Sequence, residues 1–96
     1  MSEMKVFHDI SPAIFACVKA APYLHAKYVP ADADKGSASI SISGHFPAPD
    51  TQFDLNFEFD RAPGDLSYTF VKKSGYLPVS VLWSALENAV ESCRKS

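Results

Sequence analysis

Three residue types that form nucleophilic triads occur in one part of the chain, as Ser43, His45 and Asp54. A triad needs its histidine within hydrogen-bond reach of the nucleophile. Ser43 and His45 are two residues apart in a segment that alternates like a strand, which separates their Cβ atoms by ~7 Å. No Gly-x-Ser-x-Gly elbow accompanies them. We therefore interpret His45 and Asp54 as a cross-strand pair on a wet sheet face, predict no catalytic residue, and regard an enzymatic role as uncertain and disfavoured.

Histidines and acidic residues that could bind a metal are scattered along the chain. The spacing of His8, His25 and His45 matches no H-x-x-x-H pattern, and no C-x-x-C motif is present. The segment ADADKG at 31–36 is similar to a calcium loop. Counted from Asp32, however, its glycine comes one position early, and Ser43 stands where the closing glutamate belongs. We predict no metal site and no cofactor.

The two cysteines, Cys17 and Cys93, fall in segments that the pattern predicts to be helical, both at apolar-face positions. Two cysteines alone define neither a disulfide scaffold nor a zinc site. We interpret them as buried thiols that pack as small hydrophobic groups. The alternative is a disulfide that joins the two helices.

Two neighbouring segments, Ser37–Phe46 and Phe53–Asp60, alternate apolar and polar residues with a period of two. Such alternation indicates antiparallel strands with one buried and one wet face. Matching the apolar faces across the connection 47–51 predicts the register. The predicted neighbours are Phe46 and Phe53, Ile42 and Phe57, Ile40 and Phe59, His45 and Asp54, Ser43 and Asn56, and Ser41 and Glu58.

Two helices and a further strand complete the predicted elements. Ser11 and Pro12 are a helix-start signal, and Pro22 ends that helix at or before Ala21. A longer helix is expected from Pro78 to about residue 95. Its apolar stripe consists of Val79, Leu82, Trp83, Leu86, Ala89, Val90 and Cys93. Leu66–Lys73 alternates as a third strand, and we predict another at Tyr23–Val29, after a short lead that carries Val6 and Phe7.

Together these elements predict one α+β domain over residues 1–96. Its fold is a two-layer sandwich in which an antiparallel meander of three to four strands has an N-terminal and a longer C-terminal helix on one face, in the order α-(β)-β-β-β-α. The apolar sheet face and both helix stripes form the core.

Composition narrows the classes of partner. The formal net charge is −2, the pI is near 5.8 and the basic residues are dispersed, which disfavours nucleic acid. No apolar run approaches the ~20 residues of a membrane span, and the start MSEMKVFHD does not resemble a secretory signal. We therefore expect a cytoplasmic location and no membrane partner.

The wet sheet face is the candidate site. Short serines beside acids make a smooth surface with little side-chain entropy to lose on contact. We predict a partner-binding set of Ser41, Ser43, His45, Asp54, Asn56 and Glu58. The leading hypothesis is a small non-enzymatic module that binds a protein or a second copy of itself, such as an inhibitor, an immunity protein or an accessory protein of a phage or mobile element. The alternative is an apolar-ligand binder or minor enzyme with a pocket between the sheet and the C-terminal helix.

Overall fold

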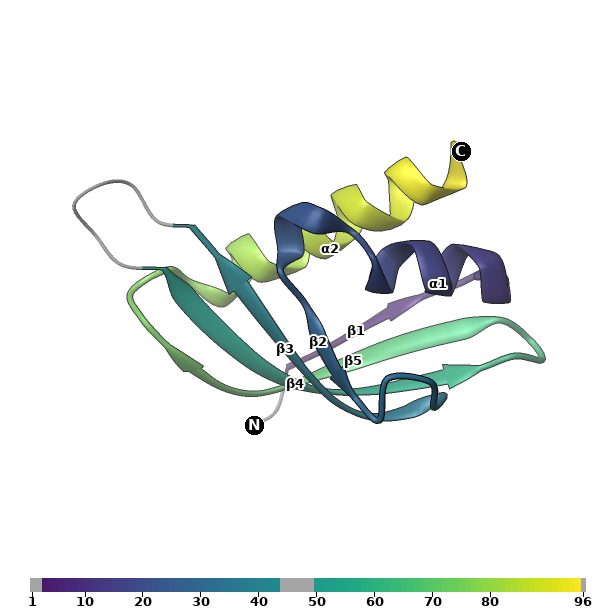
Figure 1. Ribbon diagram of the computed structural model, residues 1–96, viewed down its shortest axis with the longest axis horizontal. Coiled ribbons are helices and arrows are strands. Elements are labelled where there is room, and N and C mark those ends of the chain that lie inside the picture. The colour runs from purple at the N-terminus through teal and green to yellow at the C-terminus, as the bar shows by residue number, and fades with distance from the viewer. Residues whose placement is uncertain (1–2, 44–49, 96) are drawn as a thin grey trace.

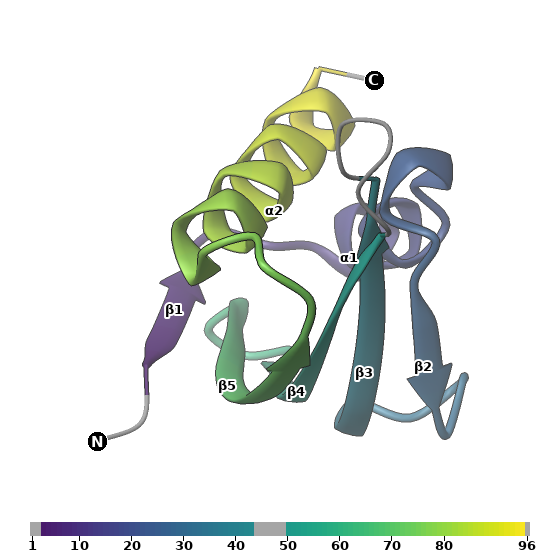
Figure 2. The same cartoon turned by 90° about the vertical axis from the view of Figure 1, so that its left-hand side faces the viewer.

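One antiparallel sheet of five strands is seen in the computed structural model, which describes residues 3–43 and 50–95. Across the sheet the order is β1-β5-β4-β3-β2. Both helices lie on the same face, with α2 toward the β1 edge (Figure 1, Figure 2). The predicted two-layer α+β fold is thus confirmed. In chain order the elements are β1 (Met4–Phe7), α1 (Pro12–Lys19), the 3-10 turn η1 (Pro22–Leu24), β2 (Lys27–Val29), β3 (Lys35–Ile42), β4 (Thr51–Asp60), β5 (Asp65–Ser74) and α2 (Val79–Arg94).

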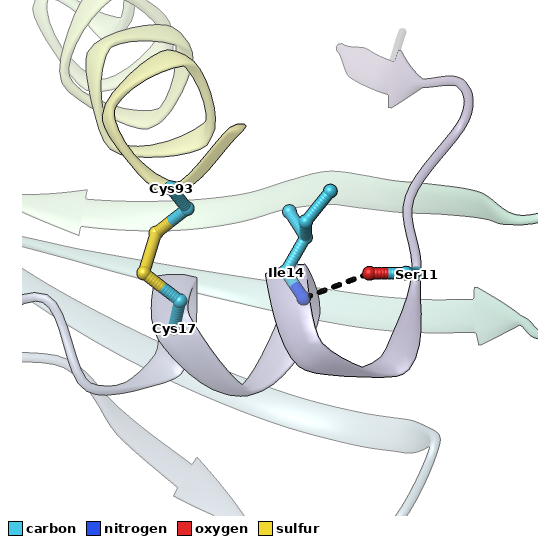
Figure 3. The surroundings of a disulfide bond; sticks show 4 residues. All are labelled: Ser11, Ile14, Cys17 and Cys93. Carbon is cyan, nitrogen blue, oxygen red and sulfur yellow. Dashed lines mark hydrogen bonds between the residues drawn. A yellow bond between two sulfur atoms is a disulfide. The ribbon is translucent and has the colours of Figure 1, made fainter. Parts of the chain in front are cut away.

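The helices begin and end where local signals place them. The Ser11 Oγ accepts a hydrogen bond from the Ile14 N–H at 3.1 Å, and Pro12 occupies the first helical position, where a missing N–H costs nothing (Figure 3). α1 ends at Lys19, ahead of Pro22. The longer α2 follows Pro78 and ends at Arg94, whose cation complements the negative end of the helix dipole.

The inner sheet face and the helices bury an aromatic core. Alternation along β4 puts its apolar side chains inward, and Phe15 of α1 packs against two of them, Phe57 and Phe59, with ring centroids 6.0 and 4.7 Å apart. The fully buried side chains of α2 include Leu82 and Leu86. Trp83 differs from expectation, because it lies half-buried at the border of the stripe, where its Nε1 donates a hydrogen bond to the Glu3 carboxylate at 3.1 Å.

Five strands exceed the three to four predicted. The lead segment Met4–Phe7 is a strand, β1, which pairs with β5 and follows no turn or long alternation that would have marked it. The strand predicted at Tyr23–Val29 is shorter, because Pro22–Leu24 forms a 3-10 turn and His25 adopts a left-handed conformation with φ of 46°. Extended structure begins only at Lys27.

The predicted β3–β4 register is wrong. Ile42 lies opposite Thr51 and Ile40 opposite Phe53, a shift of six residues from the expected partners Phe57 and Phe59. An even shift keeps every side chain on its own face, so alternation alone cannot choose between such registers. The position of the connection decides the register, because β3 ends at Ile42 and β4 begins at Thr51, so these two residues become partners. The predicted contacts of His45 and Phe46 lie outside the described residues.

The two cysteines form a disulfide, so their interpretation as buried thiols is wrong. The sulfur atoms of Cys17 in α1 and Cys93 in α2 are 2.11 Å apart, and the bond joins the facing sides of the two helices (Figure 3). The Cα atoms are 5.8 Å apart, a separation that a disulfide spans. The bond links residues 76 positions apart in sequence and thereby fixes the helical layer as a unit.

Candidate functional site

The sheet face that points away from both helices is uncovered by any element of the described chain, and we call it the open face (Figure 2). The strand registers align its side chains in rows that cross the sheet. The row through Asn56 runs over all five strands. From one edge to the other its members are Met4, Thr69, Asn56, Ser37 and Val29.

Four of the six predicted site residues alternate onto the open face, namely Ser41 on β3 and Asp54, Asn56 and Glu58 on β4. The structure brings them together with new neighbours. Ser41 lies opposite Gln52, Asp54 opposite Ser39, Asn56 opposite Ser37 and Glu58 opposite Lys35.

The remaining two predicted residues do not extend this set. Ser43 is exposed and directly follows the last residue of β3, whereas Asp54 lies opposite Ser39 farther along that strand. His45 is outside the described residues. The observed register therefore does not pair Ser43 with Asn56, and Asp54 has Ser39 rather than His45 as its β3 neighbour.

Lysines that the sequence analysis did not assign to this face offset its acids. Lys35 lies opposite Glu58, and the Lys72 Nζ is 3.9 Å from the Asp54 carboxylate. Lys27 of β2 lies opposite Ser39, in the row that also contains Asp54 and Lys72. The centre of the open face is thus a column of acids along β4 with cations on both sides, rather than a uniformly acidic surface. The observed register and the bulge in β5 supply this arrangement, and alternation predicts neither.

Apolar side chains lie around this polar centre. Within the described residues, five large hydrophobic side chains are exposed, and four of them belong to the open face: Met4 (62%), Val6 (36%), Val29 (56%) and Val71 (53%). Val71 continues the outward alternation of Ser67 and Thr69 along β5. Asp54 pairs with Lys72 while Leu55 pairs with Phe70, so Val71 is the extra residue of a β-bulge, and the bulge brings Lys72 beside Asp54.

A shallow hollow of about 230 Å³ lies between Val29 and Val71, over β3 and β4. Its polar walls are the side chains of Asp54, Asn56 and Ser37. The open face therefore combines a concave apolar spot with side chains that donate and accept hydrogen bonds and carry charges of both signs. The hollow lies between β2 and the bulge of β5, and the sequence pattern did not predict that bulge.

The space between the sheet and α2, where the alternative hypothesis puts a pocket, contains buried core side chains. Tyr68 and Leu86 are fully buried. The Tyr68 hydroxyl lies 2.8 Å from the Tyr28 hydroxyl, and the two rings pack among Phe7, Phe15 and Phe57. Burial raises the pKa of Tyr28 to about 12 and raises that of Tyr68 well above its ordinary value, so both phenols are neutral at physiological pH.

A second group of charged residues lies at the other end of the sheet. Arg61 makes two hydrogen bonds to the Asp34 carboxylate, at 2.8 and 3.1 Å, which lower the pKa of that carboxyl. The His8 Nδ1 is 2.9 Å from Asp65. These exposed pairs connect residues at or next to the ends of neighbouring strands, β3 with β4 and β1 with β5. No set of three or more histidine, cysteine or acidic side chains is arranged to bind a metal within the described ranges 3–43 and 50–95.

Comparisons of the chain with protein-family models, with curated proteins and with solved structures gave no match. In the part of the chain that the structure describes, no helix has the length and apolar character needed to cross a membrane.

Proposed function

We propose that this protein is a non-enzymatic binding module that recognises another protein through the open face. One observation carries the proposal: four of the five exposed large hydrophobic side chains in the described chain gather on the sheet face that the helices leave uncovered. Exposed apolar groups that concentrate on one surface mark interaction sites more often than scattered ones do. The strands hold these groups in fixed rows, so little ordering cost accompanies contact.

The charges favour a folded protein as the partner. Acids on β4 and lysines on the flanking strands present both signs within a few ångströms, which a polyanionic backbone would not match. A protein surface can match both signs and also cover the apolar rim. Inhibitors, immunity proteins and accessory proteins of phages or mobile elements act by such occupation of a partner's surface, and we place this protein among these functional classes.

The redox state of the two cysteines in cells can indicate the compartment in which the protein works. A cytoplasmic location remains our sequence-based prediction, and the Cys17–Cys93 bond weighs against it because disulfides persist mainly in oxidising compartments. Alkylation of protein taken directly from cells, followed by mass analysis, measures the fraction that is bonded. A fully reduced pool would support the cytoplasmic location, and a fully oxidised pool would argue for an extracytoplasmic one.

A photo-crosslinking residue at Thr69, in the middle of the open face, tests the proposal in native cells. We expect a discrete protein adduct from Thr69 and none from the same crosslinker at the exposed Ser84 of α2. Asp54→Lys combined with Glu58→Lys should then abolish the adduct while leaving the fold intact, since exposed substitutions change stability by only ~0.5 kcal/mol.

The matched control is Asp32→Lys combined with Glu91→Lys, which changes the net charge equally at exposed positions away from the open face. This control should retain the adduct. Equal crosslinking by the two double variants would disprove recognition through the open face. An adduct between two copies of this chain, with a doubled mass in size-exclusion chromatography, would show that the open face binds a second copy rather than a foreign protein.

A further inference from the structure

We propose a second, independent interaction site: the free edge of β1, beside α2, binds an extended basic segment of a partner protein as a sixth strand of the sheet. Addition of a strand to an exposed sheet edge is a common mode of peptide recognition, in which main-chain hydrogen bonds supply affinity and alternate side chains supply specificity. This site consists of backbone groups along β1, whereas the open face is a surface of side chains, and the two adjoin at Met4 and Val6.

The strand ladder shows which backbone groups of β1 are free. Phe70 N–H donates to the Glu3 carbonyl at 2.8 Å, so these two residues form a hydrogen-bonded pair of the antiparallel ladder. Hydrogen-bonded and non-hydrogen-bonded pairs alternate. Lys5 and Phe7 therefore bond to β5, and the N–H and C=O groups of Met4 and Val6 point outward, away from the sheet.

The opposite edge of the sheet is protected by a proline, which β1 lacks. β2 is followed at once by Pro30, which has no N–H to offer an incoming strand. Proline is one of the devices by which proteins prevent pairing at sheet edges. Within β1 itself no residue is a proline, and its outward backbone groups make no hydrogen bond to residues 3–43 or 50–95.

A groove of about 620 Å³ runs between β1 and the outer side of α2, next to this edge. Glu87 and Glu91, one helical turn apart, line its α2 wall. Lys5 forms an ion pair with Glu87, while the Arg94 guanidinium is bound to the His8 carbonyl. Glu91 on α2 and Asp9 beyond the end of β1 are the other two acids that line the groove, and an incoming strand would meet Glu91 along the α2 wall. On the open face, the outward side chains of the new strand would lie next to Met4 and Val6 and enlarge this apolar surface.

These walls define the ligand as a strand that alternates basic and apolar residues, with the basic row toward α2 and the apolar row toward the open face. They also argue against a second copy of this chain. In a twofold pairing of β1 with β1, the second copy would bring Lys5 as its only basic residue on this strand, and that lysine is already paired with its own Glu87. The two α2 walls would then face each other with Glu91 of each copy uncompensated. We therefore infer a foreign basic segment.

A capped heptapeptide of alternating valine and lysine is a suitable probe, with the valine–glutamate peptide as its control. Amide hydrogen exchange measured by NMR reads the geometry directly. In the free protein, Met4 and Val6 should exchange much faster than Lys5 and Phe7. At millimolar concentrations of the lysine peptide, exchange at Met4 and Val6 should slow by at least about tenfold, because each amide gains a hydrogen bond. The glutamate peptide should give no protection.

Charge reversal of the α2 wall supplies the second arm. Glu91→Lys should weaken binding of the lysine peptide by about threefold or more, as expected for loss of one exposed charge pair and gain of a repulsive one. Asp32→Lys, at an exposed position that lines neither the groove nor the open face, is the matched control and should not alter it. Unprotected Met4 and Val6 amides at saturating peptide, or equal binding of both peptides, would overturn the proposal. Protection of Val6 that grows with protein concentration alone would show that a second copy occupies the edge.

Discussion

The hydroxyl oxygens of Tyr28 and Tyr68 lie 2.8 Å apart inside the aromatic core, where each is the other's hydrogen-bond partner. The two residues come from β2, at one edge of the sheet, and from β5, on the far side of β4. Their contact therefore reaches across the inner sheet face and connects strands that do not pair with each other. A buried phenol without a partner is costly, so the pair favours one arrangement of the core over others.

Stability should fall at alkaline pH because of these phenols. Burial raises the pKa of Tyr28 to about 12, whereas a tyrosine of the unfolded chain ionises near pH 10. A group with a raised folded-state pKa contributes its full stability below the unfolded value and loses it as the pH rises through the folded value. The free energy of unfolding, measured with urea, should therefore decline between pH 10 and about 12. Constant stability up to pH 12 would contradict this.

A double-mutant cycle tests the hydroxyl pair itself. Tyr28→Phe should cost ~1–3 kcal/mol, because it leaves the Tyr68 hydroxyl buried and unpaired. Replacing both tyrosines by phenylalanine should cost less than the sum of the single changes, since no unpaired group remains. Strict additivity in urea unfolding would show that the two hydroxyls are not coupled.

The disulfide should contribute strongly to stability. Loop-closure entropy for a bond between residues 76 positions apart is worth about 4.5 kcal/mol in the chain-entropy model. A phosphine reductant should lower the unfolding midpoint of the natural chain by a corresponding amount. The variant with Cys17→Ala and Cys93→Ala is the control, and reductant should leave its midpoint unchanged. An unaltered midpoint for the reduced natural chain would show that helix packing alone holds the layer.

Gly64 should resist substitution in the turn between β4 and β5. It adopts φ of +93°, which residues with a Cβ rarely adopt, and its carbonyl accepts a hydrogen bond from the Ile10 N–H at 2.9 Å. A Cβ at this position would lie 2.9 Å from the Ile10 carbonyl oxygen. Gly64→Ala should therefore cost ~1–3 kcal/mol in urea unfolding. Ala62→Ser, at an exposed position of the same turn, should be nearly neutral, and equal effects of the two changes would refute this account.

Local patterns determined the fold class and most of the long elements. Alternation along Phe53–Asp60 sets which side chains face inward whatever strand lies beside it, and the start of α1 depends on Ser11 and Pro12 alone. For the same reason the sequence correctly assigned Asp54, Asn56 and Glu58 to one face. These properties depend only on backbone geometry and on residues that are close together in sequence.

Tertiary structure decided what depends on contacts between distant segments. The short strand β1 exists because β5 offers it a hydrogen-bonding edge, and its four residues carry too little pattern to identify alone. The β3–β4 register, which brings Lys35 beside Glu58, is one of several that alternation permits equally. The Cys17–Cys93 bond required the helices to lie side by side. The open face and the β1 edge are therefore products of packing, because an apolar residue such as Val71 becomes a contact group only where the rest of the chain leaves it uncovered.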